Sequence, residues 1–359
     1  MIRNLGSDLD PDPHAGHVPP RYRLKTLLAR VARLTGLLLY RSGLYTLVIR
    51  LGRRKPKILV YHACDLDAGP FIGGLGINTP PSDLESQLDY LTRNYRVVSL
   101  AELEADPKAE GSVTLTFDDG YRSVFENAFP LIRDRGLTAV VYLVTNTLDD
   151  NELVWVNELA WWINTFPNAC RPVLSEELGL QPGEPLAAII EVLRERYDEE
   201  LVRRLLARIR AASPEGVAQL AAEPRLYVRG EEIDTMAAAG FTFGSHTRSH
   251  PNLARLPAEQ QGEELAAARD AVAKLPGSCG SVAYPFGTFD QATRKLCSEL
   301  GFSSVMEVGG TNSPLRLDQA ARVPVARGGA AELFAQMEII TPLKALVRGW
   351  FRGSQDRPT

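Results

Sequence analysis

Short apolar runs alternate with helical patterns of apolar residues over most of the chain. Eight of these runs are rich in Val, Ile, Leu, Phe or Tyr and are bounded by turn residues, as expected of strands. They lie at residues 57–62, 96–100, 113–115, 137–144, 241–245, 281–284, 302–307 and 322–327. Apolar strands separated by helices are typical of parallel sheets whose faces are covered. The pattern therefore predicts an α/β fold and favours a (β/α) barrel.

Residues 147–229 interrupt this rhythm, and we predict a helical insertion there, on the face of the fold that carries the functional site. The segment contains three tryptophans, at positions 155, 161 and 162. Two charged helical patterns follow, at residues 185–210 and 214–222. The charged faces of these helices are expected to be solvated. The aromatic rings suit either a packed core or a wall on which sugar rings stack, and the sequence leaves both interpretations open.

The N-terminal region differs in composition from the rest of the chain. Residues 1–20 are polar and Pro-rich, which predicts a disordered arm and is not typical of a signal peptide. Residues 21–56 contain ten Arg or Lys and no Asp or Glu, and they predict a basic amphipathic helical segment. We therefore expect the protein in the cytoplasm or on the inner face of a membrane.

The apolar face of this basic segment allows two interpretations. It carries Leu37, Leu38, Leu44 and Leu47. Arg41, Gly43 and Arg50 interrupt the apolar stretch, so a membrane-spanning helix is not expected. The segment either packs on the α/β domain or makes a peripheral contact with an anionic membrane.

Overall composition limits the classes of function. The chain has 359 residues, a formal net charge of −4 and 45% apolar residues, which is ordinary for a globular enzyme and gives no nucleic-acid footprint. The four cysteines, at positions 64, 170, 279 and 297, form no CxxC pair. We expect them to be mostly buried and unpaired.

Two polar motifs follow predicted strands. Asp118 and Asp119 come directly after one strand, and Gly120 then permits a sharp turn. His246 and His250 follow another strand about 125 residues later. Adjacent carboxylates repel, so one of them usually needs a cation. Together the motifs offer two imidazoles and one carboxylate to a metal, with the second carboxylate free to act as a base. The spacing of the histidines would suit a single helical turn. By themselves, the two histidines could instead be hydrogen-bonded turn residues.

This combination resembles the polysaccharide deacetylase family, carbohydrate esterase family 4. The resemblance rests on Thr116-Phe117-Asp118-Asp119-Gly120-Tyr121, on His246-Thr247-Arg248-Ser249-His250-Pro251 and, more weakly, on Ala283-Tyr284-Pro285-Phe286-Gly287. It covers roughly residues 57–327. It implies a distorted (β/α)7 barrel with the helical insertion, a deacetylase catalytic domain over residues 57–329, and a C-terminal helix and tail over 330–359.

The resemblance also implies a ligand set and a general base. Asp119, His246 and His250 would bind a divalent metal, most readily Zn2+, although this set also accepts Co2+, Ni2+ or Fe2+. Asp118 would take a proton from the attacking water, or would instead orient a metal ligand.

Three further residues have roles implied by the family. His62 ends a strand and would protonate the leaving amine, as in a branch of the family acting on poly-N-acetylglucosamine, or it is a core histidine. The backbone N–H of Phe286 would form an oxyanion hole. The family's motif arginine is replaced by Ala283, which puts the tuning of Asp118 in doubt. Arg322 could take its place, or could form a surface ion pair.

The function that the resemblance implies is metal-dependent removal of N-acetyl groups from an N-acetylated glycan, a lipid-linked sugar or a glycan precursor. One alternative is hydrolysis of another small amide or formamide. A carbohydrate-binding module with a dead site is a second alternative. Against that second alternative, both aspartates and both histidines of the motifs are present.

Overall fold

The computed structural model describes residues 20–51, 55–148, 152–181, 183–309, 315–325 and 327–345. The disordered arm predicted over residues 1–20 therefore lies outside the described residues, except for Pro20, where the first helix begins. The predicted tail beyond residue 345 also lies outside them.

Seven parallel strands close into a barrel, which confirms the predicted α/β class. The strands are β1 (Lys57–Tyr61), β3 (Ser112–Phe117), β4 (Val140–Leu143), β5 (Thr242–Ser245), β6 (Ser278–Ala283), β7 (Ser304–Val308) and β8 (Ala320–Pro324). They pair in the order β1-β8-β7-β6-β5-β4-β3, and β3 pairs again with β1 to close the ring. A two-residue strand, β2 (Arg96–Val97), pairs only with the start of β3.

The register of the strands places the strand ends that precede the two motifs at the same height in the barrel. Tyr61 pairs with Phe117, so His62 and Asp118 each follow a strand at the same height. Leu143 pairs in the same way with Ser245, which His246 follows. Every residue of β1, β3 and β4 is buried, as their continuous apolar runs predict.

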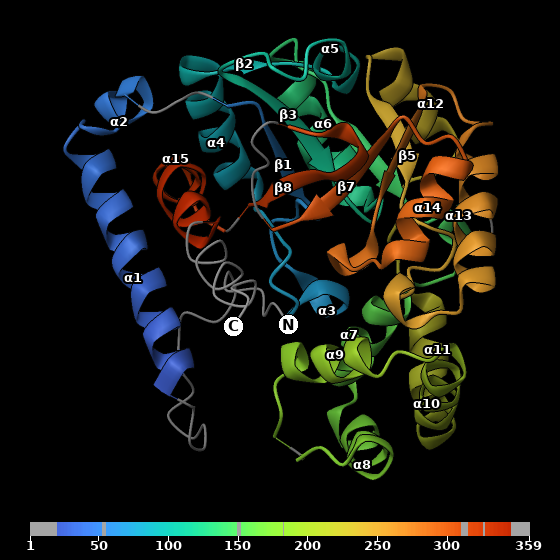
Figure 1. Ribbon diagram of the computed structural model, residues 1–359. Helices are drawn as coiled ribbons and strands as arrows, with labels where there is room; N and C mark the ends of the chain where they lie inside the picture. The colour runs from blue at the N-terminus through green and yellow to red at the C-terminus, as the bar shows by residue number, and fades with distance from the viewer. Residues whose placement is uncertain are drawn as a thin grey trace, which may run out of the picture.

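Helices cover the outside of the barrel (Figure 1). They are α4 (Pro81–Asn94), α5 (Leu100–Ala105), α6 (Phe129–Arg133), α12 (Glu231–Ala238), α13 (Ala258–Val272), α14 (Gln291–Glu299) and α15 (Ala330–Phe334). A π-helical turn, Val124–Ala128, precedes α6, and another, η6 (Ala335–Ile340), follows α15.

Five helices between β4 and α12 gather at the lower side of the barrel, beside α3 (Gly69–Ile72) (Figure 1). They are α7 (Trp155–Thr165), α8 (Pro167–Leu178), α9 (Leu186–Glu195), α10 (Glu199–Ala212) and α11 (Pro214–Ala222). The single helix expected over 185–210 is two helices, because Asp198 accepts a hydrogen bond from Leu201 N and begins α10.

The tryptophans of this region belong to the core. Trp161 and Trp162 are fully buried, and Trp155 is 7% exposed. The rings of Trp161 and Trp162 lie 5.0 Å apart and contact Phe166. The interpretation of these two as a wall for stacking sugars is therefore wrong, because protein atoms cover their faces.

The N-terminal helices attach to the outside of the barrel through one face. Helix α1 (Pro20–Arg41) and helix α2 (Tyr45–Leu51) are separated at Gly43, which has a φ of 78°. Helix α1 packs on α15 and η6. Gly36 permits the close approach, since a Cβ there would lie 2.4 Å from the Cβ of Ala335. Arg33 adds a bidentate ion pair with Glu332.

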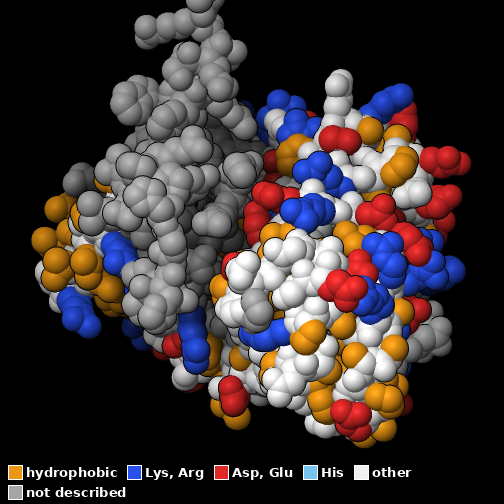
Figure 2. Space-filling view, turned by 90° about the horizontal axis from the view of Figure 1, so that it is seen from below, with side chains coloured by type: hydrophobic (Ala, Val, Ile, Leu, Met, Phe, Trp, Pro, Cys, Tyr) orange, Lys and Arg blue, Asp and Glu red, His pale blue; other side chains and the backbone are white. Residues whose placement is uncertain are grey.

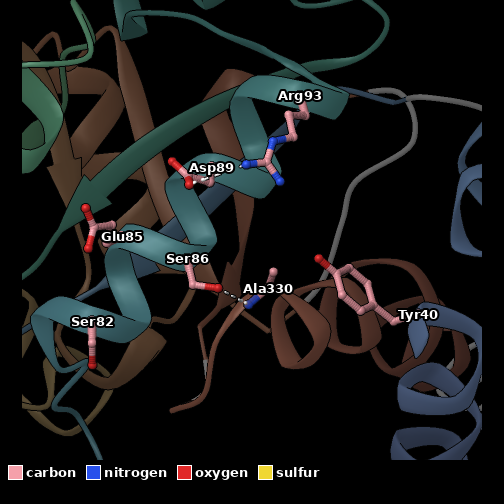
Figure 3. Close-up of a pocket in the computed structure, with 7 residues that line it drawn as sticks. All are labelled: Tyr40, Ser82, Glu85, Ser86, Asp89, Arg93 and Ala330. Atoms are coloured by element: carbon pink, nitrogen blue, oxygen red, sulfur yellow. Dashed lines mark hydrogen bonds and ion pairs between the residues drawn. The ribbon is translucent and has the colours of Figure 1, made fainter. Parts of the chain in front are cut away.

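A cavity of about 310 Å3 lies between α1, α4 and α15 (Figure 3). It is lined by Tyr40 of α1, Ala330 of α15, and five residues of α4, namely Ser82, Glu85, Ser86, Asp89 and Arg93. In the described part of the chain, no helix is both long enough and apolar enough to cross a membrane.

We expect Gly36→Leu to lower the free energy of unfolding by about 1–3 kcal/mol, because the new side chain overlaps Ala335. Urea titration measures this change. Thr35→Leu is the matched control, because Thr35 is exposed on the same helix and should change stability by less than about 0.5 kcal/mol. Equal stability of the two variants would contradict the packing described here.

Candidate active site

The site lies at the carboxyl end of the barrel strands, where backbone pairing continues one residue past β3 and β5. The N–H of Asp118 donates to Tyr61 O at 2.9 Å, and the N–H of His246 donates to Leu143 O at 2.8 Å. Both side chains are therefore held by the barrel itself rather than by a mobile loop.

The three predicted metal ligands converge on one point. Asp119 Oδ1 lies 3.4 Å from His246 Nε2 and 3.3 Å from His250 Nε2. All three side chains are buried, and among the described residues they form the one cluster of this kind that could hold a metal. The Nδ1 of His246 lies 2.8 Å from the backbone oxygen of Ala283. Donation to that oxygen leaves the Nε2 lone pair directed toward Asp119.

These residues fit a divalent cation. Asp119 Oδ1 is buried and has no hydrogen-bond partner among the described residues, which is costly unless another positive or donating group occupies the site. Burial opposes ionisation of Asp119, but contacts with His246 and His250 outweigh it and hold its pKa well below the usual value. A carboxylate and two imidazoles leave coordination positions open, as in catalytic zinc sites.

The histidine pair is carried by an irregular loop and not by the helical turn that the spacing suggested. Thr247 and His250 have φ values of 66° and 62°, in the left-handed region. The N–H of His250 donates to Thr247 Oγ1 at 3.1 Å, which closes the turn. A helical turn is wrong here because these two residues cannot be part of a right-handed helix.

A buried glutamate of α13 holds this loop, and no sequence pattern predicted its role. Glu264 accepts hydrogen bonds from the N–H groups of Arg248 and Ser249, from Arg248 Nε and from Ser249 Oγ, at 2.9–3.0 Å. It is 3% exposed. A glutamate in an amphipathic helix is ordinarily solvated, so no local pattern distinguishes this one.

Asp118 is bound by Arg322, which lies 204 residues away in sequence. The two guanidinium NH2 groups of Arg322 donate to the two carboxylate oxygens at 2.7 and 2.6 Å. Arg322 also donates to Thr116 Oγ1 at 3.1 Å and lies over the ring of Tyr142. Arg322 is 0% exposed, so the interpretation as a surface ion pair is wrong. Burial opposes ionisation of Asp118, but Arg322 outweighs it and lowers the pKa.

His62 lies close enough to this group for the charges to act on it. It follows β1 and is partly buried. Burial lowers its pKa, and the negative charges of Asp119 and Asp118 offset that effect only in part. Burial thus favours the neutral form of the His62 imidazole.

Phe286 lies beside the histidine pair. Its φ is 57°, and its ring packs against His250 with centroids 4.7 Å apart. It also contacts Trp155, whose Nε1 donates to His250 O at 3.1 Å. Asp119, with a φ of 68°, completes a set of four left-handed non-glycine residues in the described chain, all of them in this site. Such strain persists only where the surroundings impose it.

Residues of the inserted region also reach the site. The hydroxyls of Tyr121 and Tyr227 both contact the side chain of Asn157 on α7, at 2.8 Å in each case. Burial, followed by the charge of Asp119, raises the pKa of Tyr121. Helix α7 of the insertion is thus joined by a hydrogen bond to Tyr121, two residues after Asp119.

Comparisons of this chain with known proteins all point to the same family. The model of the family described as polysaccharide deacetylase matches residues 105–305, more than half of the chain. A Bacillus subtilis (strain 168) protein named "Putative polysaccharide deacetylase YxkH" is 27% identical over 100 residues. The match covers 26% of this chain and 33% of that relative, so the chain spans about a third of the relative's length.

Solved deacetylase structures share the fold. The Streptococcus pyogenes deacetylase PplD, in complex with acetate, has a TM-score of 0.52 and 16% identity, with 80% of this chain and 99% of that chain covered. A polysaccharide deacetylase from Bacillus cereus has a TM-score of 0.51 and 17% identity, with 80% and 69% covered.

We expect Arg322→Met to lower the free energy of unfolding at neutral pH by about 3–5 kcal/mol, because it leaves a buried carboxylate without a partner. Urea unfolding with chelator present measures the loss. Arg316→Met is the matched control, because it breaks an exposed Arg–Asp pair and should cost less than about 1 kcal/mol.

A double-variant cycle isolates the pair from the packing of the arginine. Asp118→Asn combined with Arg322→Met should be less destabilised than the sum of the two single variants. Additive effects would show that the two charges do not stabilise each other.

Proposed function

Because this chain belongs to the polysaccharide deacetylase family, we propose that it is a metal-dependent hydrolase that removes N-acetyl groups from an N-acetylated sugar. The sugar would be part of a polysaccharide, a lipid-linked oligosaccharide or a glycan precursor. One observation carries the proposal. A buried carboxylate, Asp118, is kept ionised by Arg322 beside three converging metal-ligand atoms.

Asp119, His246 and His250 would hold the metal, with zinc the best match to this donor set. When bound, a divalent cation acts as a Lewis acid on the amide carbonyl and lowers the pKa of a water. Glu264 and the left-handed turn at Thr247 keep the two imidazoles in place for it.

Asp118 would act as the general base. Its Oδ2 lies 4.0 Å from His246 Nε2, so the carboxylate borders the group of ligands. Arg322 occupies one lone pair on each oxygen, which leaves others free to accept a proton from the attacking water. Arg322 would be a positioning residue, since it holds the carboxylate and keeps it ionised. Arg322 would supply the positive charge that the family's motif arginine provides and that Ala283 lacks.

His62 and Phe286 complete the proposed machinery. His62 would donate a proton to the leaving amine, because it directly follows the neighbouring strand β1 and responds to the charges of both aspartates. The backbone N–H of Phe286 would donate to the oxyanion. Support for this role comes from the ring contact with His250 and from the left-handed backbone that shapes the turn.

The alternative within the same chemistry is hydrolysis of another small amide or formamide, because the same ligand atoms and the same base would act on any unhindered amide. The family match favours an acetylated sugar. The likeness in fold to PplD, solved with acetate, agrees with acetate as the product.

Acetate release from N-acetylglucosamine oligomers and from lipid-linked acetylated sugars tests the proposal. We expect the wild type to release acetate in a chelator-sensitive manner. Asp118→Asn should reduce the rate by at least about 100-fold, the usual contribution of a general base. Asp234→Asn is the matched control, because Asp234 lies in α12 and is exposed.

The outcomes separate the three functions. No release from any acetylated sugar, despite one bound metal per chain, would favour another small amide. No bound metal and no release would favour a binding module. Turnover that survives Asp118→Asn would remove Asp118 as the base.

The pH profile tests His62. A general acid must carry its proton, and burial lowers the pKa of His62 from its usual value near 6.5. We therefore expect kcat/KM to fall as pH rises through an apparent pKa below about 6.5. His62→Gln should lower the rate and remove this limb of the profile. An unchanged limb in that variant would assign the proton to another group.

A further inference from the structure

Helices α1 and α2 carry most of the large apolar side chains that the barrel leaves in solvent. Eight large hydrophobic residues are exposed in the described chain; five of them lie on these two helices, and a sixth, Leu44, lies in the turn between them. The six are Leu28, Val31, Leu34, Leu38, Leu44 and Leu47, which are 41–67% exposed. We call this set the α1–α2 apolar face. Contiguous exposed apolar surface of this kind marks an interaction site.

The barrel cannot cover this face, because α1 is already attached through its other side. Ala32 and Gly36 are buried against the α15–η6 region, and Arg33 is paired with Glu332. Leu28, Val31 and Leu38 repeat at intervals of three and seven residues, which places them on one stripe of the helix away from that contact.

Two exposed arginines flank the α1–α2 apolar face in the described chain. Arg41 and Arg50 are exposed at the ends of the two helices. Residues 21–56 contain ten Arg or Lys and no Asp or Glu, although the whole chain has a net charge of −4. Figure 2 shows orange side chains with Lys and Arg beside them at the edge of the molecule where α1 lies. The partner must therefore offer both an apolar region that can accommodate the leucine side chains and a negatively charged surface.

We propose that the α1–α2 apolar face binds the surface of an anionic phospholipid bilayer, with both helices lying in the interface. The leucines would enter the boundary between headgroups and acyl chains, while the arginines contact lipid phosphates. This attachment is peripheral, in keeping with the lack of a membrane-spanning helix among the described residues. It goes beyond the proposed deacetylase function and does not depend on it.

A second copy of the chain is a poorer partner. A symmetric dimer through this face would place each basic segment against its own copy. Like charges brought together in this way oppose association. An anionic bilayer offers acyl chains to the leucines and lipid phosphates to the arginines.

Flotation of the full chain with lipid vesicles tests the proposal. We expect binding to vesicles of phosphatidylcholine mixed with phosphatidylglycerol, weaker binding at high salt, and little binding to phosphatidylcholine alone. Leu34→Asp combined with Leu38→Asp should reduce partition at least about tenfold, because two apolar anchors are lost. Val217→Asp on α11 is the matched control, since Val217 is 41% exposed outside this face, and it should bind normally.

Charge reversal supplies an independent variant. Arg41→Glu with Arg50→Glu should weaken binding to the anionic vesicles by roughly fivefold or more for each charge. Circular dichroism and urea unfolding should show all of these variants folded, because every altered side chain is exposed.

Three results would overturn the proposal. One is failure of the wild type to float with anionic vesicles. Another is equal flotation of the wild type and the Leu34→Asp, Leu38→Asp variant. The last is a dimer in sedimentation velocity that this variant abolishes, which would assign the face to a second copy. None of these readouts uses acetate release, so failure here leaves the proposed enzyme activity untouched.

Discussion

The parallel pairing that closes the barrel between β1 and β3 is the constraint on which the site depends. It sets Tyr61 level with Phe117, and pairing of β4 with β5 sets Leu143 level with Ser245. His62, Asp118 and His246 are therefore the next residues at one end of a closed ring. A shift of one residue would turn each side chain to the other face of the sheet, and the group of ligands would be lost.

Burial of several charges at this end of the barrel then decides which partners they need. Asp118 and Asp119 are both almost inaccessible to solvent, and an unpaired buried carboxylate is unfavourable. The protein uses two different solutions. Arg322 neutralises Asp118 within the protein, whereas Asp119 faces two imidazoles and keeps an oxygen without a hydrogen-bond partner. This difference is the physical basis for proposing one carboxylate as a base and the other as a metal ligand.

The helical additions are joined to the barrel in opposite ways. The inserted helices are tied to the site by the buried contacts of Asn157 and by the indole N–H of Trp155. Among the described residues, helix α1 is attached through Gly36 and Arg33, and Val31, Leu34 and Leu38 on its other side are exposed. The insertion therefore shapes the site, while the N-terminal helices carry the separate surface that is proposed to bind a membrane.

The sequence by itself determined the strand pattern, the α/β class, and the positions of both pairs of chemical groups, because periodicity and strand ends are local properties. It left open whether Arg322 pairs with Asp118, because that contact joins residues 204 apart and exists only once β8 lies beside β1. It suggested a helical turn between His246 and His250, whereas tertiary contacts with Glu264 hold a left-handed loop. Likewise, the basic segment was recognisable as amphipathic, but only packing of Gly36 on Ala335 decided which side of α1 remains exposed. Contacts between distant residues decided each of these points, because burial and electrostatic pairing depend on which neighbours the closed barrel brings together.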